Sequence, residues 1–138
     1  MKPEFTIEAD HDLKIIRYRH TGKLSYEDIG EAWMELLSMR EFTALKYNLL
    51  SDYSKAVFNM ELSEANAIVD FLKNVGPVVR GKKQSLIVND PYSTAGSLLF
   101  QEKVFQEVGF IVNTFSTEKA ALIWLLEGTN KQNDVDER

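Results

Sequence analysis

The feature that most constrains this chain is its alternation of short β-type segments with amphipathic helical segments. Two β-type segments, residues 5–7 and 13–20, open the chain with a polar turn between them, which predicts a hairpin. Beyond the hairpin, segments with apolar residues at helical spacing alternate with short, strand-like apolar runs as far as residue 128. This alternation predicts an α/β fold with right-handed crossovers and a mostly parallel sheet.

The predicted element order is β-β-α-β-α-β-α-β-α, a five-stranded sheet flanked by four helices. After the hairpin, the predicted helices are residues 25–40, 63–75, 94–108 and 116–128, and the predicted strands are residues 47–53, 85–89 and 110–115. Residues 54–62 are predicted to form a loop. Ser25, Ser63 and Ser116 stand where a side-chain hydroxyl can cap the first free amides of three of these helices.

Length and composition indicate a single domain. The chain has 138 residues, of which 44% are hydrophobic, and this suits one compact core better than two. We expect the domain to cover residues 1–128. Residues 129–138 are polar with few apolar side chains, which predicts a C-terminal tail that frays.

Charge and cysteine content exclude several classes of protein. The formal net charge is −5, and no basic face is evident, so nucleic-acid binding is not expected. The densest basic runs, residues 17–20 and 80–83, are interpreted as solvated turns or strand faces. The chain contains no Cys, which excludes disulfides, cysteine-bound metals and thiol catalysis.

Histidine content and hydropathy argue against a metal site and a membrane span. His11 and His20 are the two histidines, and we interpret both as surface residues, so no metal and no cofactor are expected. No apolar run is long enough to span a membrane, and the first residues lack an apolar signal core. We therefore expect a cytoplasmic protein with no integral membrane segment.

Polar side chains gather where the predicted strands end. Asp52 and Ser54 lie at the end of the third strand, and Asp90 follows the fourth. The carboxyl ends of parallel strands are a common place for ligands. Asp52 and Asp90 could form an acid–base pair or hold a cation. We favour turns and helix caps instead, because these residue types form them through local hydrogen bonds, and we expect no enzymatic activity.

Apolar side chains interrupt the predicted loop before the second helix. Phe58, Met60 and Leu62 alternate with other residues there. If they are exposed, they form a rim suited to a protein partner or a hydrophobic ligand. The favoured alternative is that Phe58 and Leu62 fold back onto the second helix as a hydrophobic staple.

Three segments carry a likeness to a known superfamily. Residues 21–28 pass from a hairpin strand into a helix, residues 49–52 form a strand that ends in Asp, and residues 115–125 form a closing strand and helix. Together they resemble the SpoIIAA-like superfamily, which comprises STAS domains and a branch of small bacterial proteins related to the lipid-binding Sec14 fold. The resemblance covers nearly the whole chain and implies a SpoIIAA-like arrangement of the predicted elements.

The same resemblance implies a candidate phosphorylation site. Regulatory members of the superfamily carry a phosphorylated Ser in an Asp-Ser-Ser-Gly element that opens the second helix. When Asp52 is placed on the Asp that ends the family's strand, residues 60–63 fall at about that element. Its Asp and Gly are missing here, and Ser63 is the hydroxyl that remains. A phosphate on Ser63 would lie at a helix N-terminus, which favours negative charge.

Two functions follow from the resemblance. The first is a non-enzymatic regulatory or interaction module of the STAS type, which acts through the surface of residues 54–67 on a protein partner. The second is a protein that binds a small apolar or lipid-like ligand in an enclosed cavity near Phe58, Met60 and Phe71. The candidate surface residues are Asp52, Ser54, Phe58, Met60 and Ser63. A homodimer through an edge strand of the hairpin or an exposed helix face is compatible with either function.

Overall fold

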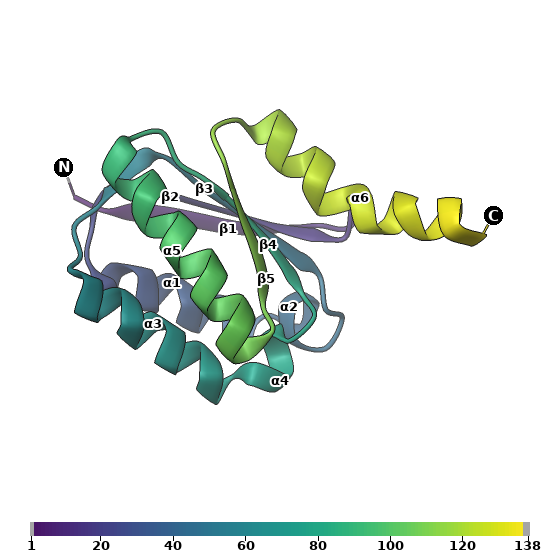
Figure 1. Cartoon of the computed structure of the whole chain (residues 1–138), viewed down its shortest axis with the longest axis horizontal. Coiled ribbons are helices and arrows are strands. Elements are labelled where there is room, and N and C mark those ends of the chain that lie inside the picture. Colours follow the sequence, from purple (N-terminus) through teal and green to yellow (C-terminus); the bar gives the residue numbers. More distant parts are fainter. Residues whose placement is uncertain (1, 137–138) are drawn as a thin grey trace.

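Five strands form one mixed sheet in the order in which they occur along the chain (Figure 1). The computed structural model describes residues 2–136, with side chains described for residues 2–61 and 63–127. The strands are β1 (Glu4–Asp10), β2 (Ile15–Leu24), β3 (Asn48–Phe58), β4 (Lys83–Ile87) and β5 (Ile111–Phe115). β1 is antiparallel to β2, and the other neighbouring strands are parallel. The predicted N-terminal hairpin and mostly parallel α/β sheet are confirmed.

Four long helices and two short ones accompany the strands in the described part of the chain. They are α1 (Tyr26–Ser38), α2 (Arg40–Thr43), α3 (Leu62–Asn74), α4 (Gly76–Val79), α5 (Pro91–Val108) and α6 (Glu118–Asp136). The short helices α2 and α4 were not predicted, and α6 continues past Gly128, where it was expected to end. We predicted that residues 129–138 fray. The side chains of these residues and the backbone of residues 137–138 lie outside the described part of the chain, so the fraying stays a prediction. None of the described helices is both long and apolar enough to cross a membrane.

The order of the strands decides which face each helix covers. Because the order never reverses, right-handed crossovers place α1, α3 and α5 on the same face of the sheet (Figure 1). α6 covers part of the opposite face, where its Ala121 and Leu125 pack against Leu50 and Ile87. Leu86, the neighbour of Ile87, faces the three-helix side. A sheet without a reversal has no switch-point crevice at its strand ends, so space for a ligand has to lie elsewhere.

β3 extends further than predicted because of a bulge against β2. Arg19 pairs with Asp52 but Thr21 pairs with Lys55, so one residue of β2 faces two residues of β3. The extra residue shifts the alternation of β3 by one position, and Ala56 therefore faces the same core as residue 53. The predicted loop at residues 54–62 is thus wrong over most of its length, because β3 stays paired with β2 as far as Phe58.

One predicted helix cap is confirmed and two are wrong. Ser25 caps α1: its hydroxyl accepts a hydrogen bond from the amide three residues further on at 3.2 Å. Ser63 lies inside α3, and the cap residue is Glu61, whose amide donates to the Glu64 carboxylate at 3.2 Å. At α6, Thr117 takes the place expected for Ser116, and its hydroxyl accepts from the third helical amide at 3.2 Å.

Two basic side chains that were predicted at the surface are buried. His20 is 1% exposed, and its Nδ1 lies 2.5 Å from the Tyr18 hydroxyl. Burial lowers the pKa of His20. Lys82 is 4% exposed, with its Nζ 3.5 Å from the centre of the Phe42 ring and donating to the Phe42 carbonyl oxygen. Burial, together with the charge of Lys46, lowers the pKa of Lys82 to about 7.

Candidate functional site

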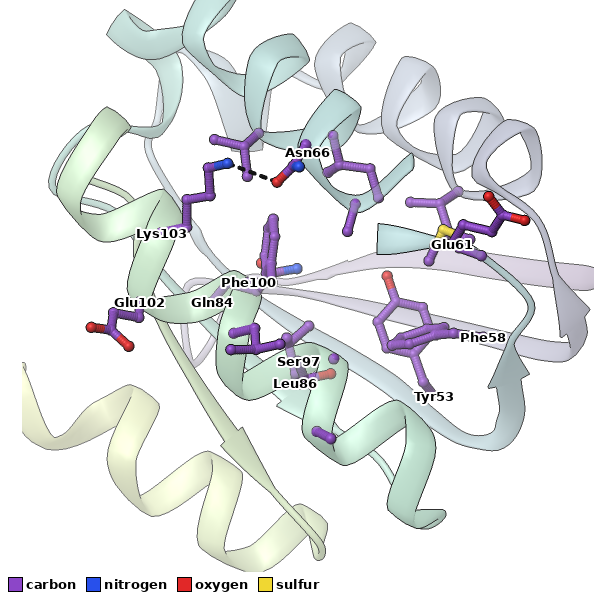
Figure 2. A pocket seen from close by; sticks show the side chains of 18 of the residues that line it. Tyr53, Phe58, Glu61, Asn66, Gln84, Leu86, Ser97, Phe100, Glu102 and Lys103 are labelled. Atoms are coloured by element: carbon purple, nitrogen blue, oxygen red, sulfur yellow. Dashed lines mark hydrogen bonds between the residues drawn. The ribbon is translucent and has the colours of Figure 1, made fainter. Parts of the chain in front are cut away.

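A cavity of about 790 Å³ opens between α3 and α5, above β3 and β4 (Figure 2). This volume lies in the range of sites that bind small molecules, roughly 300–1,000 Å³. Most of its lining is apolar and comes from α1, β3, α3, β4 and α5. The larger apolar and aromatic lining residues are Ile29, Trp33, Tyr53, Phe58, Met60, Ile68, Val69, Leu86, Leu99 and Phe100. We call this cavity the α3–α5 cleft.

Small residues on the two helices leave the space that forms the cleft. α5 contributes Ala95, Gly96 and Ser97 in succession, and α3 contributes Ala65 opposite them. A Cβ atom added at Gly96 would meet no atom within 4 Å. Because these side chains are too short to reach across the gap between α3 and α5, the space above the sheet stays unfilled.

One end of the cleft is held by hydrogen bonds between α5 and the end of β3. The Tyr92 hydroxyl donates to the Met60 carbonyl oxygen at 2.6 Å. The Ser93 hydroxyl accepts from the Phe58 amide at 3.1 Å. The Asp90 carboxylate caps α5 by accepting from the Ser93 amide at 2.9 Å. These bonds fix Phe58 and Met60 at the end of the cleft.

The outer rim of the cleft is polar and also links α3 to α5. The Lys103 ammonium group donates to the Asn66 side-chain oxygen at 2.7 Å (Figure 2) and lies 3.8 Å from the Glu107 carboxylate. Lys73 of α3 reaches the Glu107 carboxylate of α5 at 2.6 Å. Glu107 raises the pKa of Lys73, and Lys73 lowers the pKa of Glu107.

The charges that line the cleft are predominantly negative. Among the described lining residues, Glu61, Glu102 and Glu107 carry carboxylates, and Lys103 carries the one positive charge. That ammonium group is engaged with its neighbours on the rim. The cleft therefore presents an apolar interior behind a rim of three carboxylates, of which Glu107 is paired with the ammonium groups of Lys73 and Lys103.

Two polar side chains lie among the apolar residues at the base of the cleft. Gln84 of β4 and Ser97 of α5 are each 2% exposed. The Gln84 amide nitrogen donates to the Ser51 hydroxyl at 2.9 Å. In the described part of the chain, the Gln84 Oε1 and Ser97 Oγ atoms are buried without a hydrogen-bond partner. A buried polar atom without a partner costs about 1–3 kcal/mol.

The predicted surface residues are divided between two places. Phe58 and Met60 line the cleft. Asp52 instead lines a separate pocket of about 90 Å³, where its carboxylate accepts from the Arg19 guanidinium at 3.2 Å and from the Ser54 amide at 2.9 Å. The five predicted residues therefore do not form one surface.

Two further residues named from the sequence lie outside the cleft lining. Ser63 is exposed near the start of α3, and Phe71 is partly buried against the core. Neither is among the residues that line the cavity. The sequence led us to expect an enclosed cavity near Phe58, Met60 and Phe71, whereas the cleft is open and is lined by Phe58, Met60 and α5 but not by Phe71.

The two candidate acid–base residues have separate roles. Asp52 binds Arg19 and the Ser54 amide, whereas Asp90 caps α5 and lines neither cavity. His11 is exposed and its Nδ1 lies 3.0 Å from the Tyr47 hydroxyl. No three His, Asp or Glu side chains among the described residues lie close enough together to hold a metal ion.

The sequence did not lead us to the cleft residues contributed by α5 and β4, such as Gly96 and Gln84. The available signal was the run of small residues at 93–97, Ser-Thr-Ala-Gly-Ser, at the start of a predicted helix. A helix that begins with such small side chains cannot fill the space beside a sheet. The signal for Gln84 was weaker, because a polar residue at the start of a short apolar strand is expected at an exposed end.

Comparisons with known proteins were made for family, sequence and structure. No family model matches the chain, and no curated protein matches it by sequence. Among solved structures, it is similar to an uncharacterized protein of the DUF3478 family from Shewanella loihica PV-4, described as having a SpoIIAA-like fold. The TM-score is 0.56 and the identity 16%, over 89% of this chain and 93% of the other. The sheet order, the helix placement and this likeness together show that the chain has a SpoIIAA-like fold.

Proposed function

We propose that this protein binds a small, mainly apolar molecule in the α3–α5 cleft, in a non-enzymatic role. The observation that carries the proposal is a cavity of about 790 Å³ with a predominantly apolar lining between α3 and α5. A domain of this size would gain stability by filling such a space with its own side chains. An apolar molecule that enters the cleft releases water from both surfaces, which favours binding by about 25 cal/mol per Å² buried.

A second candidate function is the interaction module implied by the superfamily. Its specific support is the exposure of Ser63 in the first turn of α3, where a phosphate would be close to free helix amides. Such a module would recognise a protein partner through the surface of residues 54–67. The surface of residues 54–67 overlaps the cleft lining, because Phe58, Met60 and Ala65 belong to both, so a ligand in the cleft and a partner on the surface are expected to affect each other's binding.

Ligand binding is tested by filling the cleft from one helix position. In Gly96→Leu, the new side chain occupies the cleft because Gly96 lines it and its Cβ direction is open. Gly30→Leu is the matched control: it also lies in a helix with open space around its Cβ, but outside the cleft. Both changes remove a helical Gly and should raise helix stability by about 0.5–1 kcal/mol.

The readout is energy transfer from Trp33 to the neutral fluorescent probe N-phenyl-1-naphthylamine. Trp33 lines the cleft, whereas Trp124 lies in α6 and packs with Phe115, so the measurement is made in a Trp124→Phe background. We expect one probe per chain in the parent and in Gly30→Leu, and at least tenfold weaker binding in Gly96→Leu. Equal binding by all three proteins would place the probe elsewhere and refute the proposed site.

A further inference from the structure

We propose that the ligand of the α3–α5 cleft is a neutral amphiphile, whose hydroxyl or carboxamide group binds Gln84 and Ser97. Its apolar body then fills the space between the two helices. This inference rests on the proposed binding function and adds the chemical class of the ligand. It excludes anionic amphiphiles such as fatty acids and lipid phosphates as the preferred occupants.

The first support is the pair of unpartnered oxygens at the base of the cleft. Gln84 and Ser97 come from different elements, β4 and α5, and line the same cavity (Figure 2). Each residue is 2% exposed, and each has one buried oxygen without a hydrogen-bond partner in the described part of the chain. Buried polar groups are nearly always paired in folded proteins. A ligand group that binds these two oxygens would supply the missing partners.

The second support is the hydrogen-bonding capacity of these two side chains. The Ser97 hydroxyl both donates and accepts, and rotation about its χ1 angle redirects it toward the cleft. The Gln84 amide is held by the Ser51 hydroxyl, which can also donate or accept. With its nitrogen on Ser51, the Gln84 amide leaves Oε1 as its free end, so a ligand has to supply a hydrogen-bond donor there. Hydroxyl and carboxamide groups suit this site because they both donate and accept, whereas a carboxylate only accepts.

The third support is the distribution of charge. Neither Gln84 nor Ser97 carries a charge. Among the described residues that line the cleft, Lys103 has the one ammonium group, and Asn66 and Glu107 engage it on the rim. An anionic group at the base would lose its water without gaining a counter-ion, which is strongly unfavourable. The carboxylates on the rim would also repel it. A neutral polar group avoids both effects.

The test compares ligands with the same apolar chain and different polar groups. Decanol, decanamide and decanoate are titrated at pH 8 against the bound N-phenyl-1-naphthylamine probe. We expect decanol and decanamide to displace the probe at concentrations at least tenfold lower than decanoate. Displacement by decanoate at equal or lower concentration would overturn the inference.

Variants separate specific recognition from the greater water solubility of decanoate. In the double variant Gln84→Met with Ser97→Ala, the preference for decanamide over decanoate should shrink about tenfold. Ser85→Ala is the matched control, because the Ser85 hydroxyl lies on the opposite face of β4 and donates to the Ala121 carbonyl oxygen at 2.9 Å. This control should keep the full preference. If the preference for decanamide persists unchanged in the double variant, Gln84 and Ser97 do not recognise the polar group of the ligand.

The experiment distinguishes three failures: a variant that does not fold, a cleft that does not bind a ligand, and a cleft that binds a ligand of another chemical class. If the double variant fails to fold, Ser97→Ala alone replaces it, since removal of an unpartnered buried hydroxyl does not break any hydrogen bond within the described chain. Its expected effect is about a threefold loss of the preference, and no loss would count against the inference. Failure of the parent protein to bind the probe refutes the binding function itself. Normal probe binding without a preference among the three ligands refutes only the ligand class.

Discussion

Replacing Lys82 by Met should remove a large part of the pH dependence of folding stability between pH 7 and pH 9. Lys82 is 4% exposed, and burial lowers its pKa from 10.5 to about 7. Between these two values the unfolded chain binds a proton that the folded chain has released. Stability therefore rises with pH in this interval, by at most about 1.4 kcal/mol per pH unit for one group.

The structure also sets the size of the expected effect. Across the full interval, from about pH 7 to pH 10.5, the contribution of Lys82 amounts to about 5 kcal/mol at most. Met keeps the length and much of the packing of the Lys stem without the titrating amine. The variant should thus lose the slope while it stays folded. The measurement stops at pH 9 because burial raises the pKa of both Tyr18 and Tyr53, which makes stability fall above about pH 10.

The assay is urea denaturation of the parent, Lys82→Met and the control Lys83→Met at pH 7, 8 and 9. Lys83 is the next residue in the chain, but it lies on the other face of the sheet, where its ammonium group donates to the Trp124 carbonyl oxygen at 3.3 Å. We expect the parent and Lys83→Met to gain stability with pH and Lys82→Met to gain about 1 kcal/mol less per pH unit. Equal slopes in all three proteins would refute the buried, low-pKa state of Lys82.

Four further predictions concern local features. Ser25→Ala should lower the free energy of unfolding by about 1 kcal/mol, measured by urea denaturation, because it removes the cap of α1. Ser63→Ala should change it by less than about 0.5 kcal/mol, since Glu61 is the cap residue of α3, and a larger loss would restore Ser63 as a cap. If the interaction module is correct, Ser63→Asp and Ser63→Ala should both fold but bind the partner differently. Burial lowers the pKa of His20, so NMR should show it titrating below pH 6.5. Its contribution to the free energy of unfolding is therefore lost as the pH falls below 6.5. Titration above that value would contradict the burial of His20.

The order of strands and long helices could be predicted because it depends on local patterns. Strand-like runs such as residues 85–89 and capping signals such as Ser25 need only a few neighbouring residues to act. The length of β3 could not be predicted in this way. Its bulge breaks the period of two between Tyr53 and Ala56, and the pairing that extends it to Phe58 comes from β2, far away in the sequence.

The candidate site was only half predictable for a similar reason. Phe58 and Met60 were named because they are apolar residues next to a predicted helix start, and they line the cleft. The opposite wall depends on α5 crossing the same face of the sheet, which is a property of the strand order. The burial of Lys82 likewise depends on a distant segment, because its ammonium group contacts the ring and carbonyl oxygen of Phe42 in α2. No local charge pattern in the sequence indicates this contact.

The proposal that the α3–α5 cleft holds a small molecule is tested most directly by native mass spectrometry of the protein purified from its own host. The parent protein and Gly30→Leu should each carry one non-covalently bound organic molecule per chain, which denaturing solvent releases. Gly96→Leu, whose new side chain occupies the cleft, should show the bare mass of the chain. A bare parent protein, or an equally loaded Gly96→Leu, would contradict the account.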